Sequence, residues 1–121
     1  LATAQTLVVT TADPTPMREA IRFFRDLPSN AQHPTSVIFN RSLPVAWVDA
    51  TPMDEDPELA SNLARWSTES ARQQRLRRQF SERYSTEVTT MDWQPTAPTD
   101  LDSLESLLTT AGGYSLENLW N

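Results

Sequence analysis

Two short runs of apolar and β-branched residues, free of charge, constrain the fold of this chain more than any other feature. The first reads TLVVTT at residues 6–11 and the second TSVIFN at residues 35–40. Runs of this kind are typical of strands buried on both faces, as in a parallel sheet. Parallel neighbours need a crossover connection, and the segment between the runs is long enough to supply a helix. We therefore predict a strand, a helix and a second strand in an α/β fold.

The segment between these runs has the pattern of an amphipathic helix. Thr15 is suited to cap its start, Pro16 to occupy its first position, and Pro28 to end it. Apolar residues recur there at helical spacing and form one stripe: Met17, Ala20, Ile21, Phe24 and Leu27. We expect this stripe to pack on the sheet.

The second half of the chain continues the alternation. Residues 41–57 contain three prolines and are predicted to form a loop. Apolar residues then recur from Glu58 onward, beginning with Leu59, Leu63 and Trp66, and indicate one long helix or two helices bent near residues 67–70. Residues 87–93 are predicted to form a third strand. Asp100 is expected to cap a final helix with a leucine face: Leu101, Leu104, Leu107 and Leu108.

The predicted order is therefore β-α-β-α-β-α, in a single domain that covers residues 1–121. It corresponds to half of a doubly wound, three-layer fold with a mainly parallel sheet. Ligands of such sheets bind beyond the carboxyl ends of the strands. The segments to inspect for function are residues 10–16, 40–44 and 93–99.

The residue types that are missing exclude several kinds of chemistry. The two glycines, Gly112 and Gly113, stand together and lysine is absent, so no glycine-rich loop with a lysine is present to cradle phosphate. The chain has no cysteine and only one histidine, His33, so we expect no metal site. On its own the chain is not expected to transfer phosphoryl groups.

The charge balance is acidic, with 16 acidic residues against 10 arginines and a net charge of −6. A nucleic-acid partner is not favoured, because phosphate contacts need local positive charge in excess. We expect a solvated helix surface for the arginines of one stretch: Arg72, Arg75, Arg77, Arg78 and Arg83. No apolar run is long enough to span a membrane and no signal peptide is recognisable, so a cytoplasmic location is expected.

The segment TLVVTTADPTPMREAIRFFRDL, followed by TSVIFNRSLP, resembles the later strands of ArsA-type ATPases. In that family a strand ending in a threonine- or serine-rich turn leads to a helix with a recurrent Glu, and the next strand ends in Asn-Arg or Asn-Gln. The stretch ARQQRLRRQFSERYSTEVTTMDWQPTAPTDLDSLESLL is similar to the family's closing helix, strand, proline loop and terminal helix. The resemblance covers residues 6–111.

This resemblance implies a partial P-loop NTPase fold without the Walker A loop. The chain would be the C-terminal, adenine-side part of an ATPase that couples ATP binding and hydrolysis to anion transport or client transfer. It begins at Leu1 rather than at Met, close to its first strand, so we expect a fragment of a longer protein. ATP and Mg²⁺ are implied for that whole protein and not for this chain alone. The partners implied are an N-terminal P-loop part of the same protein, a second copy in a homodimer, and a membrane pump.

The resemblance also implies roles for Asn40 and Arg41. Asn40 would hydrogen-bond adenine, for which an amide is suited because it offers a donor and an acceptor side by side. Arg41 would flank the base or the ribose. From the residues alone, Asn40 also fits a plainer role, in which it ends a strand and caps a turn.

The proline loop after the third predicted strand supplies the remaining candidates. Pro95 matches a proline that packs against adenine in the family, and Trp93 or Gln94 would add an apolar face or a hydrogen bond beside it. Ala97 stands where the family has an acidic residue, and Pro98 is an additional constraint. An ordinary turn before a capped helix is the alternative interpretation of this loop.

Glu19 matches the family's recurrent helix acid, but a place in the first helical turn would explain it through the helix dipole alone. The Cys-x-x-Cys zinc clasp of the family's eukaryotic targeting branch is missing, so zinc-mediated dimerisation is not expected. Two other functions stay open. The chain would be either a stand-alone α/β domain for protein interaction or regulation, or part of a MinD-like ATPase.

Overall fold

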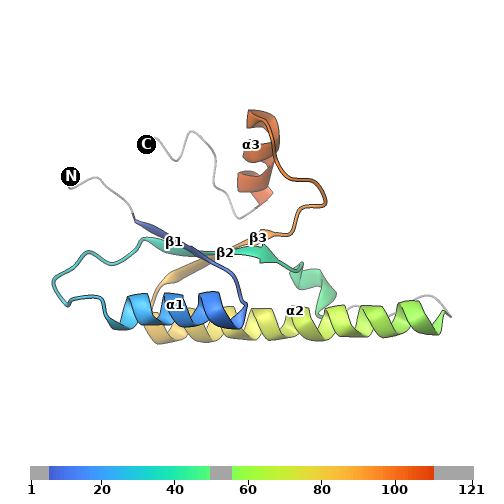
Figure 1. The fold of residues 1–121 in the computed structure, drawn as a ribbon, viewed down its shortest axis with the longest axis horizontal. Coiled ribbons are helices and arrows are strands. Elements are labelled where there is room, and N and C mark those ends of the chain that lie inside the picture. Colours follow the sequence, from blue (N-terminus) through green and yellow to red (C-terminus); the bar gives the residue numbers. More distant parts are fainter. Residues whose placement is uncertain (1–5, 50–55, 111–121) are drawn as a thin grey trace.

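The computed structural model describes residues 6–49 and 56–110, with the side chains of residues 108–110 outside the description. Strands, helices and one short 3-10 helix (η1) alternate along these residues (Figure 1). Their bounds are β1 Leu7–Thr10, α1 Pro14–Arg25, β2 Ser36–Ser42, η1 Val45–Trp47, α2 Pro57–Tyr84, β3 Glu87–Asp92 and α3 Leu101–Thr110. The predicted order of strands and helices is confirmed.

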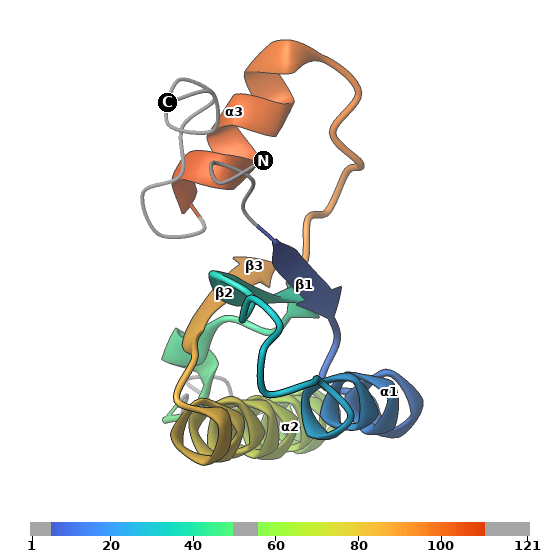
Figure 2. The ribbon, with the colours of Figure 1, turned by 90° about the vertical axis from the view of Figure 1, so that its left-hand side faces the viewer.

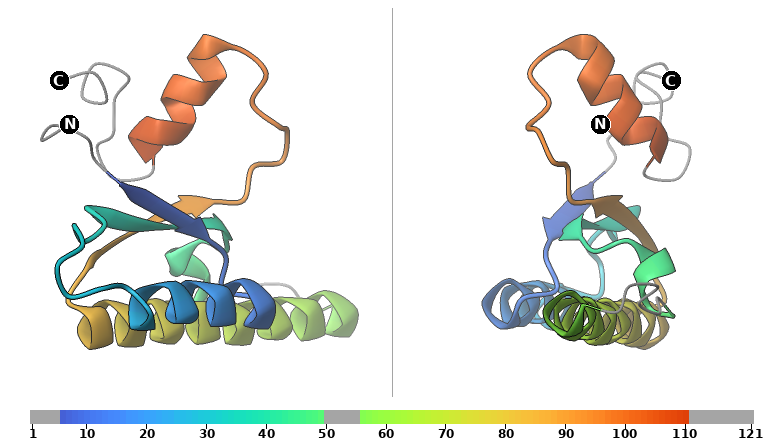
Figure 3. Two further views of the ribbon diagram at one scale, coloured as in Figure 1. Left: turned by 60° about the vertical axis from the view of Figure 1, so that its left-hand side comes forward. Right: turned by 90° about the vertical axis from the view of Figure 1, so that its right-hand side faces the viewer.

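The strands form a parallel sheet in the order β1-β2-β3. Helices α1 and α2 lie side by side on one face of this sheet, and α3 lies on the opposite face (Figures 2 and 3). Two right-handed crossovers that advance in the same direction place their helices on the same face, which explains the pairing of α1 with α2. The sheet is thus the middle of three layers, and the predicted α/β class is confirmed.

The core lies between the sheet and the α1–α2 layer, and Phe80 of α2 stands at its centre. The ring of Phe80 lies 5.3 Å from that of Phe24 on α1 and 5.8 Å from that of Phe39 on β2, in both cases edge to face. Tyr84 packs on the same ring at 4.8 Å. These aromatic contacts join both helices to the central strand, which is why the core is continuous across all three elements.

The opposite face of the sheet is covered only in part. Ile38 of β2 is buried there, whereas Val9 of β1 is 62% exposed. Of the leucines predicted to line α3, Leu101 and Leu104 are exposed and Leu107 is half-buried, while the side chain of Leu108 is outside the description. Helix α3 therefore shields the β2 and β3 side and leaves β1 open.

Some predicted boundaries were wrong. Helix α1 begins at Pro14 after Asp13, not after Thr15, because both prolines of this segment fit a first turn that needs no amide donors. It ends at Arg25, before Pro28. Strand β2 continues through Arg41 to Ser42, where the sequence predicted a loop, and η1 follows it.

The open question about α2 is settled in favour of one helix of 28 residues. Asp56 caps its start by accepting hydrogen bonds from the backbone N–H groups of Glu58 and Leu59. Ser67 and Ser70, where a bend was considered, donate their hydroxyls to carbonyls of the segment after β2. Because these hydroxyls are used in tertiary contacts, they do not compete with the backbone of their own helix. Among the described residues, no helix has the length and apolar character needed to cross a membrane.

The expectation that all arginines of this helix are solvated was wrong for Arg77. Its side chain is buried, 5% exposed, and one terminal nitrogen, Nη1, has no hydrogen-bond partner. Burial lowers the pKa of this guanidinium, and the charge of Asp92 acts in the opposite direction. A buried donor without a partner destabilises the folded state.

We predict that Arg77→Met raises the free energy of unfolding by about 1 kcal/mol, because it removes the unsatisfied donor and keeps the apolar stem. The matched control is Arg78→Met, at an exposed position of the same helix. Urea unfolding at neutral pH measures both variants. A lower stability for Arg77→Met, with Arg78→Met unchanged, would show that the buried charge is compensated.

Candidate functional site

The carboxyl ends of the three strands meet at one edge of the sheet, and two neighbouring cavities open there. The larger, about 580 Å³, is named the tryptophan cavity, and its lining includes Trp47, Trp66, Trp93, Arg41, Glu69 and Gln73. The smaller, about 310 Å³, is named the amide cavity, and its lining includes Asn40, Gln94, Arg41, Trp93, Pro98 and Leu107. All three segments singled out from the sequence, residues 10–16, 40–44 and 93–99, contribute to the lining of the tryptophan cavity.

The side chains of Arg41 and Trp93 separate these cavities. The guanidinium carbon of Arg41 lies 4.3 Å from the centre of the Trp93 ring. A cation over an indole face is worth about 0.5–1 kcal/mol at an exposed site. Both residues line both cavities, so the stacked pair forms a shared wall.

The position of this wall follows from a bulge in β2. Phe39 pairs with Thr90 and Ser42 with Asp92, so the two residues between them, Asn40 and Arg41, face one residue of β3. Arg41 adopts a φ of 53°, a left-handed conformation that costs a non-glycine residue on the order of 1–3 kcal/mol. Bulges of this kind redirect a side chain next to a site. Here the bulge accompanies the stacking of Arg41 on Trp93.

Asn40 takes part in the same bulge. Its side-chain oxygen accepts a hydrogen bond from the backbone N–H of Arg41 at 2.9 Å. This bond lies within β2, which continues to Ser42, so Asn40 does not end the strand as the plainer interpretation had it. The amide nitrogen of Asn40 has no partner among the described residues. The oxygen keeps a second lone pair, so this bond leaves the amide able to donate and to accept a further hydrogen bond.

The five residues predicted from the sequence are distributed over both cavities. Asn40 and Gln94 line only the amide cavity, and Gln94 is oriented by a 3.0 Å hydrogen bond from its side-chain nitrogen to the Asp92 carbonyl. Pro95 lines only the tryptophan cavity. The structure therefore groups four of the five around one cavity and places Pro95 beyond the wall formed by Arg41 and Trp93.

Helix α2 holds the strand ends through a polar network on one of its faces. Gln73 is buried, and its side-chain oxygen accepts from the backbone N–H of Leu43 at 2.9 Å. Its nitrogen donates to Glu69, which also accepts two hydrogen bonds from the guanidinium of Arg72. Arg72 in turn donates to the carbonyl of Ala12, just after β1. The network thus ties the ends of β1 and β2 to one helix.

The same helix positions a pair of tryptophans. Ser70 donates to the Pro44 carbonyl at 2.8 Å and Ser67 to the Val48 carbonyl at 2.6 Å, so both ends of η1 are fixed on α2. Trp47 of η1 consequently lies against Trp66 of α2, with ring centres 6.1 Å apart in an edge-to-face arrangement. Both indoles stay open to the tryptophan cavity.

Sequence reasoning missed the residues that α2 and η1 contribute: Trp47, Trp66, Glu69 and Gln73. Trp66 was assigned to an apolar stripe with Leu59 and Leu63, but Leu59 and Trp66 are each 51% exposed. The available signal was the spacing of residues 66, 69 and 73, which lie on one helical face. The role of this face depends on the position of the sheet above it, which helical spacing alone does not give.

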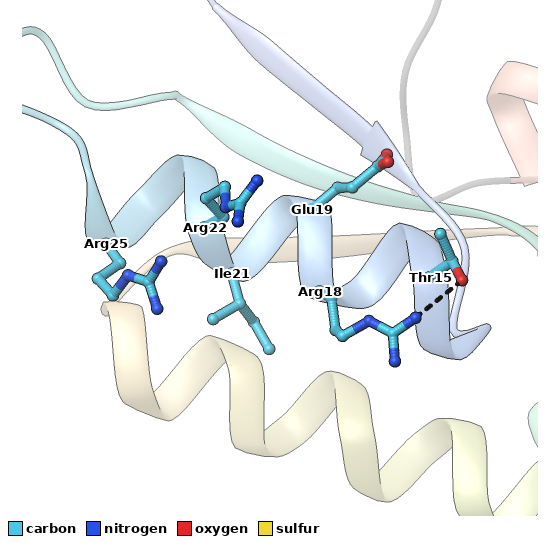
Figure 4. Close-up of a pocket in the computed structure, with 6 residues that line it drawn as sticks. All are labelled: Thr15, Arg18, Glu19, Ile21, Arg22 and Arg25. Atoms are coloured by element: carbon cyan, nitrogen blue, oxygen red, sulfur yellow. Dashed lines mark hydrogen bonds between the residues drawn. The ribbon is translucent and has the colours of Figure 1, made fainter.

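A further hollow, of about 370 Å³, lies on the outer side of α1 (Figure 4). Its lining comes from this helix alone, and the one hydrogen bond drawn there joins Arg18 to Thr15 at 3.1 Å. Glu19 lines it and lies away from the strand-end cavities. The helix begins at Pro14, so Glu19 falls in the second turn, and the first-turn dipole explanation was wrong.

Within the described ranges, no group of three or more His, Cys, Asp or Glu side chains is placed to hold a metal ion. The acidic residues Asp54 and Glu55 lie outside the described residues. No protein-family model, curated protein or solved structure matches the chain.

The Glu69–Arg72 pair gives a prediction about pH. The hydrogen bonds from Arg72, aided by Gln73 and opposed by burial, hold the pKa of Glu69 below its ordinary value of 4.5. A carboxylate with a depressed pKa stabilises the fold above its ordinary value, and this contribution is lost as the pH falls through the folded pKa.

We therefore expect Glu69→Gln to lower the free energy of unfolding at pH 7, by about 1 kcal/mol or less because the pair is partly exposed. The difference from the unmodified chain should shrink as the pH falls below about 4.5. Urea unfolding at a series of pH values measures it, with the exposed Glu82→Gln on the same helix as control. A difference that does not depend on pH would contradict this role for the carboxylate.

Proposed function

We propose that this chain is the adenine-side, C-terminal part of an ArsA-like ATPase, which couples ATP binding and hydrolysis to anion transport or client transfer in the cytoplasm. The chain alone is not catalytic in this proposal. The observation that carries it is the grouping of Asn40, Gln94, Arg41 and Trp93 around the amide cavity. This cavity lies beyond the carboxyl ends of parallel strands, where α/β sheets bind nucleotides.

The amide cavity has the chemistry that an adenine ring requires. Adenine presents a hydrogen-bond acceptor beside an amino donor, and the amide of Asn40 has a donor and a lone pair left beside its bond to the Arg41 N–H. Trp93 is 55% exposed and offers a flat apolar surface, with Leu107 and Pro98 also in the lining. A volume of about 310 Å³ lies at the lower end of the range for small-molecule sites.

Groups for phosphate and Mg²⁺ must come from elsewhere in this proposal. The sequence has no lysine, and the described residues hold no cluster of acidic side chains for a divalent ion. We assign these groups to an N-terminal P-loop part of the same protein. Strand β1 pairs on one side only among the described residues, and the exposed Val9 leaves its outer face open, so further strands would extend the sheet there.

The proposal extends to the partners of the whole protein. The likeness to ArsA-type ATPases implies two partners: a second copy in a homodimer, and a membrane pump that is driven by ATP hydrolysis.

The competing function is a stand-alone protein-interaction domain. It is favoured by the exposure of three tryptophans at one opening, because tryptophan is enriched among residues that dominate binding interfaces.

Calorimetric titration of ATP into the longer protein encoded by the same reading frame tests the proposal. We expect Asn40→Ala to weaken binding about tenfold, the effect of losing roughly 1.4 kcal/mol of hydrogen bonding. Asn62→Ala, at an exposed position on α2 away from both cavities, is the matched control and should bind as the unmodified protein does.

Two results would overturn the proposal. One is a reading frame without a glycine-rich loop and lysine upstream of this chain. The other is ATP binding that Asn40→Ala leaves unchanged, which would place the base outside the amide cavity. Either result would favour the stand-alone interaction domain.

A further inference from the structure

The tryptophan cavity has no role in the proposed function, and two of its tryptophans belong to a larger exposed apolar surface. Leu59 and Trp66 lie on one side of α2, and each is 51% exposed. Val45 and Trp47 of η1 are exposed as well, and Trp47 lies against Trp66. Several large apolar side chains gathered in one region mark an interaction surface. We name the surface made of Val45, Trp47, Leu59 and Trp66 the docking face.

The shape of the docking face suits a helix. The N-terminal half of α2, which carries Leu59, projects beyond the sheet (Figure 1). Leu59 and Trp66 are about 10 Å apart along the helix axis, the rise of two turns. A straight apolar edge of this length matches the spacing at which a second helix places its anchoring side chains, every third and fourth residue. A partner helix would therefore lie alongside α2.

The charges that line the tryptophan cavity nearly balance. Its carboxylates are those of Asp13 and Glu69, and its cation is Arg41. Glu69 is paired with Arg72, whereas Asp13 makes no ion pair with a described residue. Asp13 and Arg41 thus leave one unpaired charge of each sign. The lining by itself selects neither an anion nor a cation, so the charges around the docking face decide.

Two carboxylates stand at the margin of the docking face. The hydroxyl of Ser67 donates to the carbonyl of Val48, which holds the next residue, Asp49, beside the turn of α2 that carries Trp66. Glu58 lies in the first turn of α2. Asp49 and Glu58 are both exposed, and neither makes an ion pair with a described residue. Both are therefore available to a partner.

Negative charge is in excess over this whole part of the chain. Residues 45–69 contain six acidic residues and one arginine, Arg65. Two of the six, Asp54 and Glu55, are outside the described residues, and Glu69 is paired with Arg72. The three that remain outnumber Arg65. The margin therefore complements a partner with basic side chains.

The indole rings attract the same sign of charge as the margin does. The face of an indole carries a negative potential and binds cations. The chain itself uses this contact, since the guanidinium of Arg41 lies over the ring of Trp93. Trp47 and Trp66, at 38% and 51% exposure, keep ring surface open. Rings and carboxylates together favour a partner that presents basic side chains beside apolar ones.

We propose that the docking face binds a basic amphipathic helix of another protein. The apolar side chains of that helix pack on Leu59 and Trp66 and enter the tryptophan cavity, whose volume is about 580 Å³. Its lysines and arginines lie at the margin, against Asp49 and Glu58. The inference does not depend on the proposed ATPase, because the amide cavity takes no part in it.

The test measures binding of a labelled synthetic peptide of leucine and lysine, patterned as an amphipathic helix, to this chain by fluorescence anisotropy. We expect Trp66→Ala to weaken binding about tenfold, the loss typical of a tryptophan at the centre of an interface. Leu59→Ser, outside the cavity lining, should weaken it as well. Asn40→Ala, which lines only the amide cavity, should leave it unchanged. Far-ultraviolet circular dichroism checks that each variant is folded.

A second set of titrations tests the role of charge. Asp49→Asn combined with Glu58→Gln should weaken binding of the lysine peptide about threefold, because exposed ion pairs contribute little each. The matched control combines Glu82→Gln with Glu87→Gln, the same change of net charge at exposed positions near the other end of α2, and should have no effect. A peptide with glutamine in place of each lysine should bind more weakly and should not respond to the Asp49 and Glu58 changes.

Three results would overturn the inference. The first is an equal loss of binding from the margin variant and from its matched control, which would reduce the effect to a general attraction of the acidic chain. The second is a peptide with glutamate in place of lysine that binds as tightly as the lysine peptide. The third is unchanged binding in folded Trp66→Ala and Leu59→Ser chains, which would place the peptide on another surface.

Discussion

The hydrogen bond from the backbone N–H of Leu43 to the buried amide of Gln73 is the constraint on which the strand-end region depends. Where a strand leaves its sheet, its backbone N–H and C=O groups need other hydrogen-bond partners. A buried backbone group without a partner lowers the stability of the fold by about 1–3 kcal/mol. Helix α2 supplies such partners along one of its faces. One turn from Gln73, the hydroxyl of Ser70 donates to the Pro44 carbonyl. This arrangement requires α2 to be continuous, and it is.

The two cavities follow from that arrangement. Once Leu43 is fixed on α2, Asn40 and Arg41 are held between the pairs that Phe39 and Ser42 make with β3, and the extra residue is taken up as a bulge. The left-handed backbone conformation of Arg41 carries local strain, which the surrounding hydrogen bonds offset. Its stacking on Trp93 then divides one opening into a polar half near Asn40 and an aromatic half near Trp66.

The strands of the sheet, and the residues that strand ends bring to the candidate site, could be predicted from the sequence. Charge-free β-branched runs identify β1 and β2, and the rule that parallel strands end at one edge brings Asn40 near Trp93 without any structure. The placement of Pro95 and the contributions of Trp66 and Gln73 could not be predicted, because they depend on which face of α2 lies under the strand ends. Arg77 was mistaken for a surface residue for the same reason, since helical spacing does not give the rotation of a helix against its sheet.

Hydrogen exchange at the Leu43 amide tests most directly whether α2 sets the geometry of the strand ends. The informative variant is Gln73→Met, which keeps the length of the side chain and removes its hydrogen bonds. We predict that Leu43 loses its protection and the indole resonance of Trp93 shifts, while amides in the middle of β2, such as that of Ile38, keep theirs. Unchanged protection of Leu43 in a folded Gln73→Met chain would show instead that the sheet alone holds the strand ends in place.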